Sequence, residues 1–319
     1  MLDAGQIHEL GAGEVISEEG FYSLPLVRHH GQPCAGASVT SSVLRTMELA
    51  SPADVWAFHQ LNPDRYERAA SPALRRGAAM AAFIEAGPEG LERVVRVLPK
   101  DKPRRPTEAQ LRNYALGRAS DAARASVEYW RDVDADPRDP ISEEVFDQLY
   151  EAGKVLARDP AARVALGGVP EISAAFWCEE SRLWVLSRPD VMSFDGSVID
   201  YKQWAPQGSF FDARFVDRRI TGGFYHMQLA LAAEAYERLT GDWPHTVGFV
   251  VQMPTPPYHV VLRAVDEDDL RLGMLQNRRA RLRFRECLDS GHWPGPGEHV
   301  GAYQMPGWLH ERLNEEFTA

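Results

Sequence analysis

Apolar residues recur three and four positions apart over most of the N-terminal half of the chain, which is the spacing of amphipathic helices. Serine or threonine stands at the start of some of these segments, with proline just inside others, as is typical of helix N-termini. The pattern predicts helices within residues 38–49, 51–61, 71–87, 107–131 and 141–159, and a short strand at 93–98.

After Pro170 the chain changes to short runs rich in β-branched and aromatic residues, which are typical of strands. The order predicts an α/β or α+β fold with a mixed sheet, in one domain because no linker is visible. A mainly helical part (1–168) would precede the sheet and its helices (169–289), and a tail rich in glycine, proline and tryptophan (290–319) would pack as irregular structure. The predicted strands are 171–179, 183–193, 197–204, 245–253 and 258–265, and the predicted helices are 223–240 and 266–289.

Composition narrows the class of protein. Three cysteines, Cys34, Cys178 and Cys287, are scattered and form no CxxC pair. This argues against a disulfide framework and against a cysteine-built zinc or iron–sulfur site. The first residues lack the charged and apolar regions of a secretory signal, and no apolar run approaches the roughly 18 residues that span a bilayer. We therefore expect a cytoplasmic protein without a membrane segment.

The formal net charge of −11 argues at first against a nucleic-acid partner, but binding depends on where the charges lie. Basic residues cluster in KDKPRRP (100–106) and in NRRARLRFR (277–285). Taken alone, each run is as typical of a solvated helix face as of a contact with a polyanion. The charge pattern thus permits DNA binding without demonstrating it.

The segment RPDVMSFDGSVIDYKQW (188–204) places two aspartates and a lysine around a turn between two predicted strands. A two-residue turn would pair residues 190 and 201, which leaves the aspartates on opposite faces. A three-residue loop, 194–196, with glycine in the left-handed position, would instead set Asp190 opposite Asp200. Because side chains alternate along a strand, Lys202 would then share the face of Asp200.

This second register would bring two carboxylates and an ammonium to one place. Two like charges so close raise each other's pKa unless a cation compensates, and carboxylate oxygens suit Mg²⁺ or Mn²⁺. A divalent ion there could activate water against a phosphodiester, with the lysine orienting or deprotonating that water. An aspartate beside a hairpin is also commonly just a turn residue, so spacing alone leaves both interpretations open.

The residues RPD (188–190) and VIDYK (198–202) resemble the PD-(D/E)xK nuclease signature. The surrounding chain resembles the exonuclease VIII (RecE-type) family of phages and prophages. The segments that carry this resemblance, in chain order, are SSVLRTMELASPADVWAF, ALRRGAAMAAFIEAG, VPEISAAFW, YHMQLALAAEAY, GHWPGPGE and MPGWLHE. The resemblance implies a restriction-endonuclease-like core of the PD-(D/E)xK type with an N-terminal helical region.

The resemblance also implies a role for each matching residue. Asp190 and Asp200 would be metal ligands together with the backbone carbonyl of Tyr201. Lys202 would be the catalytic lysine, and Glu171 would assist the metal or its water from the neighbouring strand. The candidate DNA contacts are Lys102, Arg104, Arg105 and Tyr225.

One further matching position is Gln228, which would contact the scissile phosphate or order the lysine. Two positions depart from the family pattern. The family's Gly-x-x-x-His motif has Ala81 four residues after Gly77, and the tyrosine of a Gln-x-x-x-Tyr motif is replaced by Ala232. The missing histidine removes one group that could reach a metal.

The activity implied is that of a Mg²⁺-dependent exodeoxyribonuclease, for which Mn²⁺ would also serve. It would degrade one strand of linear duplex DNA from the 5′ end and leave a 3′ tail for recombination. Relatives form rings around DNA and work with a RecT-type single-strand annealing protein, so a ring-shaped homo-oligomer and such a partner are expected. The alternative is a weakened or silent relative that binds DNA ends or scaffolds a recombination complex, which the alanine at position 81 supports.

Three other features are interpreted as structural. The adjacent His29 and His30 lie in a segment with proline and glycine, and we expect a solvated pair. His226 is close to Gln228 on its predicted helix and could face the site or pack beneath it. The tryptophans on or beside the predicted strands, Trp177, Trp184 and Trp204, are expected in the core.

Overall fold

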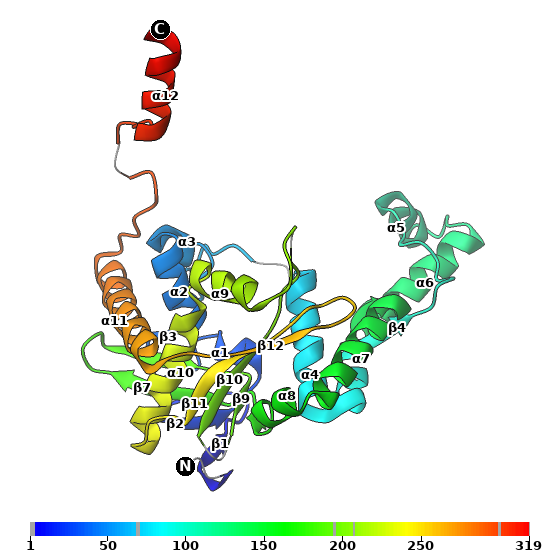
Figure 1. The fold of residues 1–319 in the computed structure, drawn as a ribbon. Helices are drawn as coiled ribbons and strands as arrows, with labels where there is room; N and C mark the ends of the chain where they lie inside the picture. Colours follow the sequence, from blue (N-terminus) through cyan, green and yellow to red (C-terminus); the bar gives the residue numbers. More distant parts are fainter. Residues whose placement is uncertain (1–3, 68–70, 194–195, 207, 299–300, 319) are drawn as a thin grey trace.

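Two five-stranded sheets form the centre of the molecule in the computed structural model, which describes residues 1–319 except 1–3, 68–70, 194–195, 207, 299–300 and 319 (Figure 1). Parallel and antiparallel neighbours are mixed in both sheets, as predicted. The first sheet has the order β1 (Ile7–Glu9), β2 (Gly20–Ser23), β7 (Ser173–Cys178), β8 (Leu183–Ser187) and β3 (Ser38–Thr40). The second has the order β12 (Val260–Ala264), β11 (Thr246–Gln252), β10 (Ser197–Gln203), β9 (Val191–Met192) and β6 (Val169–Pro170).

The first sheet takes three of its strands from the N-terminal part of the chain, which the sequence predicts as mainly helical. Strand β2 pairs with β7, and β3 pairs with β8. Each of β1, β2 and β3 has only three or four residues. Strands this short carry too little alternation to stand out from a loop.

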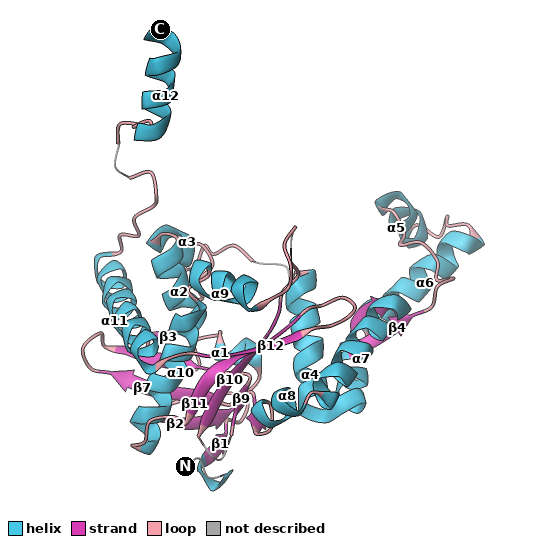
Figure 2. Cartoon of the chain, viewed as in Figure 1, coloured by secondary structure: helices cyan, strands magenta, loops and turns pink. Residues whose placement is uncertain are grey.

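Helix α10 (Tyr225–Thr240) packs against both sheets. Its Leu231 packs in the cluster that contains Phe176 of β7, whereas its Leu229 packs with Phe249 of β11. Helix α11 lies close beside α10. A Cβ atom added at Gly273 of α11 would lie only 2.6 Å from the side chain of Ala230 in α10. Figure 2 colours the helices cyan; apart from α4 to α8 and α12, they are α1 (Leu26–His29), α2 (Ser41–Leu49), α3 (Pro52–Trp56), α9 (Ala213–Gly222), α10 (Tyr225–Thr240) and α11 (Glu267–Ser290).

The predicted strand 183–193 is divided between the two sheets. It forms β8 and β9, which are separated by Arg188, Pro189 and Asp190. Proline lacks an N–H and restricts the residue before it, so a strand cannot continue regularly through this position. The predicted strand 171–179 is shortened as well, since Glu171 lies between β6 and β7 in a left-handed conformation with φ of 58°. Both breaks lie where the chain crosses from one sheet to the other.

An arm extends from the sheets and carries the first basic run (Figure 1). Helix α4 leads into it and bends at Gly87, whose φ is 63°, where the sequence predicts the helix end. The small core of the arm contains Leu98, Trp130 and Val133. The elements from α4 onward are α4 (Pro72–Val94), β4 (Val95–Leu98), α5 (Glu108–Ala115), α6 (Asp121–Ala135), β5 (Asp139–Ser142), α7 (Glu143–Arg158) and α8 (Pro160–Ala165).

The C-terminal tail contains a helix where the sequence predicts irregular structure. Helix α12 (Gly307–Thr318) begins just after Pro306 and projects away from the sheets (Figure 1). The prediction of irregular structure rests on the glycines and prolines that precede residue 307, whereas the residues after it favour a helix. Within the described residues, no helix combines the length and apolar character needed to cross a membrane.

Candidate active site

A cleft of about 1000 Å³ lies at the end of β10, between α2, α4, α9 and α10. It contains one group of predicted residues together, namely Glu171, Asp190, Tyr201, Lys202, Tyr225 and Gln228. These residues are spread over more than fifty positions of the chain and come from β10, α10 and the two sheet crossings. The fold therefore assembles most of the predicted site at one place.

The register between β9 and β10 is the one that the three-residue loop requires. Val191 pairs with Ile199 and Met192 with Val198, so the next position sets Asp190 opposite Asp200. The backbone N–H of Tyr201 donates to Asp190 Oδ2 over 2.6 Å. Residues 194 and 195 of the loop lie outside the described part of the chain. The register prediction is confirmed by the paired residues on either side.

Asp200 is the most buried acid of the site, with 1% of its surface exposed. Its Oδ2 forms an ion pair with Nζ of Lys202. Its Oδ1 accepts a hydrogen bond of 2.7 Å from Nε2 of Gln228. Gln228 thus holds the carboxylate of Asp200 in place, and Asp200 in turn pairs with Lys202. Gln228 can therefore order Lys202 through Asp200.

The two acids and the lysine perturb one another. Burial raises the pKa of Asp190 to about 8, with further increases from the charges of Asp200 and Glu171 and an opposing effect of Lys202. Burial by itself would lower the pKa of Lys202, but the carboxylates of Asp200 and Asp190 outweigh it and raise that pKa above its ordinary value. At neutral pH the lysine is therefore an ammonium.

Glu171 is held through both its backbone and its side chain. Its backbone N–H donates to the carbonyl oxygen of Asp190 over 3.0 Å, which ties together the two sheet crossings. Its carboxylate accepts from Nε of Arg188 over 2.6 Å. A left-handed conformation is costly for a glutamate and is common at functional sites. The prediction that this residue acts from within a strand is wrong, since it lies between β6 and β7.

The acids fit a divalent cation in part. Burial and then the charge of Asp200 raise the pKa of Asp190, and oxygen ligands of this type suit Mg²⁺ or Mn²⁺. Across the described ranges, no three His, Cys, Asp or Glu side chains stand close enough to hold one ion together. The hydroxyl of Tyr201 donates to Gln252 over 2.6 Å in the core, and the role of its backbone carbonyl as a metal ligand stays a prediction.

The cleft is also lined by histidines and arginines that were not predicted to belong to the site. The prediction of a solvated histidine pair is wrong for His29, which is 3% exposed and hydrogen-bonded through Nδ1 to Ser173 Oγ at 3.0 Å. The further cleft residues are His30, Arg45, Arg218 and Arg219. Their only signal in the sequence is the pair Arg218-Arg219 shortly before the Tyr-x-x-Gln helix.

Stacked cations and rings form one wall of the cleft. The guanidinium of Arg45 lies 4.2 Å from the ring centre of Tyr225. The ring of Tyr225 is 5.1 Å from that of Trp204, and the guanidinium of Arg219 lies 5.6 Å from Trp204. The wall is therefore basic, which suits a phosphate backbone.

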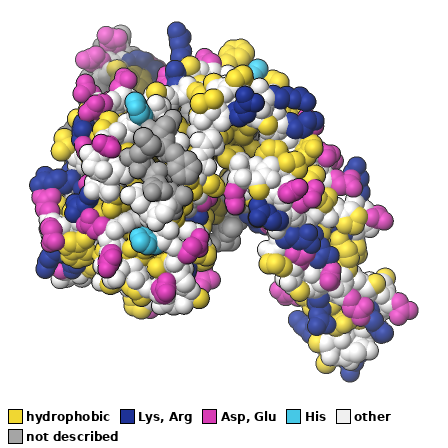
Figure 3. All heavy atoms as spheres, turned by 90° about the horizontal axis from the view of Figure 1, so that it is seen from below, with side chains coloured by type: hydrophobic (Ala, Val, Ile, Leu, Met, Phe, Trp, Pro, Cys, Tyr) yellow, Lys and Arg dark blue, Asp and Glu magenta, His cyan; other side chains and the backbone are white. Residues whose placement is uncertain are grey.

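The predicted contacts Lys102, Arg104 and Arg105 lie in the arm and do not line the cleft. Arg105 is engaged within the arm, because it pairs with Asp134 at 2.7 Å and lies 4.5 Å from the ring centre of Trp130. The structure therefore gives Arg105 a structural role. Side chains of both charge signs are interspersed over the surface of the molecule seen from below (Figure 3).

The two departures from the family pattern have different surroundings. Gly77 and Ala81 both line the cleft, so position 81 is where a histidine would reach the site. Ala232 is 1% exposed and Tyr236 is 2% exposed, and both pack in the core of α10. Position 81 therefore lies at the cleft, whereas position 232 lies in the core.

Comparison with known proteins bears on the fold. No family model matches the sequence. No curated protein matches it either. The structure is similar to the crystal structure of a protein from Eubacterium rectale described as a “putative exonuclease”, with a TM-score of 0.57 and 12% identity over 92% of this chain and 98% of that one. The two chains share a fold. At this identity the likeness extends to the architecture alone.

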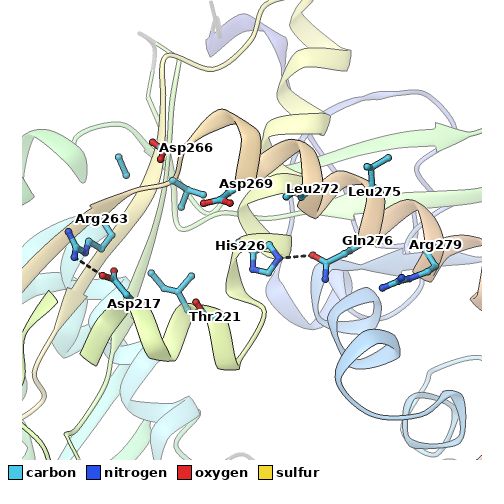
Figure 4. A pocket seen from close by; sticks show the side chains of 13 residues that line it. Asp217, Thr221, His226, Arg263, Asp266, Asp269, Leu272, Leu275, Gln276 and Arg279 are labelled. Atoms are coloured by element: carbon cyan, nitrogen blue, oxygen red, sulfur yellow. Dashed lines mark hydrogen bonds and ion pairs between the residues drawn. The ribbon is translucent and has the colours of Figure 1, made fainter. Parts of the chain in front are cut away.

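His226 belongs to a different pocket. Its Nε2 is hydrogen-bonded to Gln276 Oε1 at 2.6 Å, in a cavity of about 680 Å³ beside α9 and α11 (Figure 4). Arg263 pairs with Asp217 at 2.8 Å across the same cavity. The helix α10 therefore presents His226 to this second pocket and Gln228 to the cleft, so His226 does not face the predicted site.

Proposed function

We propose that the protein is a metal-dependent exodeoxyribonuclease of the PD-(D/E)xK type. It would degrade one strand of linear double-stranded DNA, from the 5′ end by resemblance, and leave a 3′ tail. The observation that carries the proposal is the arrangement of Asp190, Asp200 and Lys202, with Asp190 opposite Asp200 and Lys202 paired to Asp200. The shared fold with a protein described as a putative exonuclease supports it.

Each residue of the site has a separate role in this proposal. Asp190 and Asp200 would hold Mg²⁺ or Mn²⁺, which when bound lowers the pKa of a coordinated water and polarises a phosphoryl oxygen. Lys202 is charged at neutral pH, because the carboxylates raise its pKa. It would therefore donate to the phosphate as negative charge develops, in preference to acting as the base. Gln228 would keep Asp200 in place through its 2.7 Å hydrogen bond.

The basic wall of the cleft supports a polyanionic substrate. Arg45, Arg218 and Arg219 line the same cleft as the acids. They supply local positive charge in a chain whose formal net charge is −11. A ring-shaped homo-oligomer and a RecT-type single-strand annealing partner complete the proposal by resemblance.

The alternative is a silent relative that binds DNA ends. Two observations favour it, namely that Glu171 is paired with Arg188 and that Ala81 occupies the position of the family histidine. Both reduce the number of groups available to a cation. Because Asp190, Asp200 and Lys202 are all present, we place the active enzyme first.

Incubation of the full chain with linear duplex and with closed circular DNA, with Mg²⁺ or with EDTA, tests the proposal. We expect loss of the linear DNA alone, and only with Mg²⁺. Intact linear DNA with both Mg²⁺ and Mn²⁺, from folded protein, would overturn the enzyme. A gel shift on the same DNA would then decide whether the DNA-binding alternative holds.

A further inference from the structure

The carboxylate of Glu171 is held by an arginine beside the cleft. Nε of Arg188 donates to Oε2 of Glu171 over 2.6 Å. The side chain of Arg188 is 10% exposed and that of Glu171 is 29% exposed. The pair is therefore partly shielded from water. Through this pair, Arg188 occupies the carboxylate of Glu171.

Arg188 does not depend on Glu171 for its place. Its Nη1 donates to the carbonyl oxygen of Leu24 over 2.6 Å and to Ser173 Oγ over 3.4 Å. Ser173 is hydrogen-bonded in turn to the buried His29 at 3.0 Å. The guanidinium would thus keep two partners if the glutamate side chain turned away.

Glu171 can turn without moving its backbone. Its N–H is fixed to the carbonyl oxygen of Asp190 at 3.0 Å, so the main chain stays beside the aspartates. Glu171 already lines the cleft, so a change of its side-chain torsions could bring the carboxylate to a cation bound there, and such rotations are fast for a partly exposed side chain. The residue is therefore anchored next to the acids while its carboxylate is free to exchange partners.

We propose that Arg188 is a positioning residue that holds the Glu171 carboxylate away from Asp190 and Asp200 until a divalent cation in the cleft competes for it. Glu171, Asp190, Arg188 and Lys202 line the cleft, and the buried Asp200 pairs with Lys202, so three carboxylates stand against two cations. A divalent cation that recruits Glu171 gains a third carboxylate. Arg188 thereby sets the cation affinity of the site. The inference rests on the proposed function only in requiring a cation at these acids.

Calorimetric titration of the full chain with Mn²⁺ tests this inference in a double-mutant cycle. The four proteins are the wild type, Arg188→Met, Glu171→Gln and the double variant. We expect Arg188→Met to tighten Mn²⁺ binding by roughly tenfold, the scale on which neighbours of metal ligands act. The tightening should vanish in the Glu171→Gln background, because no carboxylate is left to be released.

Three results would overturn the inference. They are weaker or unchanged Mn²⁺ binding by Arg188→Met, equal tightening in the Glu171→Gln background, and no Mn²⁺ binding by the wild type. Equal tightening would mean that Arg188 acts only through its charge. If Arg188→Met does not fold, the cycle is repeated with Arg188→Lys, which keeps the charge but cannot hold Glu171 and Leu24 together. A tightening of a few-fold that depends on Glu171 is then expected, and its absence would overturn the inference.

The outcome is separable from that of the proposed function. DNA digestion by the wild type together with a flat cycle would reject the role of Arg188 and keep the nuclease. A coupled cycle in a protein that digests no DNA would keep the role of Arg188 and reject the nuclease.

Discussion

Asp190 stands opposite Asp200, one register position beyond the pair Val191–Ile199. The two acids reach this arrangement by different routes. Asp200 is part of β10, whereas Asp190 lies after Pro189, where the chain leaves the first sheet and enters the second. A break in one strand next to an unbroken strand thus creates the acid pair on which the proposed chemistry depends.

The pair of Asp200 and Lys202 makes a prediction about stability. Asp200→Asn removes a buried charge and leaves the ammonium of Lys202, whose side chain is 21% exposed, without its ion-pair partner. We expect the free energy of unfolding, measured with urea, to fall by about 3 kcal/mol. Lys202→Met in the same chain should restore part of this loss.

Asp217→Asn is the matched control for that prediction. Asp217 pairs with Arg263 at 2.8 Å, but its side chain is 53% exposed. We expect a change below about 1 kcal/mol for such a solvated pair. Equal effects of the two substitutions would contradict the view that burial makes the Asp200 pair important.

The raised pKa of Asp190 makes stability depend on pH. The folded protein holds this proton more tightly than the unfolded chain, because the pKa rises from 3.8 to about 8 through burial and then through the charge of Asp200. The group therefore favours the folded state at low pH, and this contribution is lost as pH rises through about 8.

Replacing Asp190 tests this sign. In EDTA and above pH 8, Asp190→Asn should be more stable than the wild type by at least about 1 kcal/mol, because the variant has no charge to bury. The gain should shrink toward acidic pH. Urea unfolding above pH 8 and at acidic pH measures this difference in stability. A variant that is less stable than the wild type in alkaline EDTA would contradict the account.

His59 gives the opposite dependence. Burial lowers its pKa from 6.5 to about 4, partly offset by a hydrogen bond to the backbone of Ser38. The unfolded chain then binds the proton more tightly, so stability is present above pH 6.5 and is lost as pH falls toward 4, by about 3 kcal/mol in total. His59→Phe should reduce this loss in urea unfolding, whereas His245→Phe at an exposed position should leave it unchanged.

The basic wall makes a prediction about DNA binding. Replacing both Arg218 and Arg219 with glutamine should weaken the binding of a DNA duplex in EDTA and lower the salt slope by about 2, one for each lost phosphate contact. Fluorescence anisotropy over a range of salt concentrations measures both quantities. Arg283→Gln, at an exposed position of α11, is the control. An unchanged slope for the double variant would place the DNA elsewhere.

Much of the fold follows from the sequence because its signals are local. The long amphipathic segments become α7, α10 and α11 with nearly the predicted bounds, since a helix period repeats over many residues. The register of β9 and β10 was predictable only as one of the two that the sequence allows, namely the one with a three-residue loop that contains glycine. The helix α12 and the strands β1 to β3 were not, since they are short or follow a run of helix-breaking residues.

The candidate site divides in the same way. Asp200 and Lys202 could be placed on one face from strand alternation, and Asp190 could be placed with them in one of two possible registers. The pairing of Glu171 with Arg188 could not, because it depends on a left-handed residue and on a strand broken at Pro189. Arg45, Arg218 and Arg219 come from α2 and α9, and only tertiary packing brings those helices to the acids.

Digestion of end-labelled linear duplex DNA tests the central claim most directly. The wild type, Lys202→Ala and the matched control Lys154→Ala, which removes an exposed lysine paired with Glu151, would be compared with Mg²⁺. We predict rapid release of the 5′ label by the wild type and the control, and a loss of at least about 100-fold in Lys202→Ala. Equal digestion by Lys202→Ala would show that this site does not carry the activity.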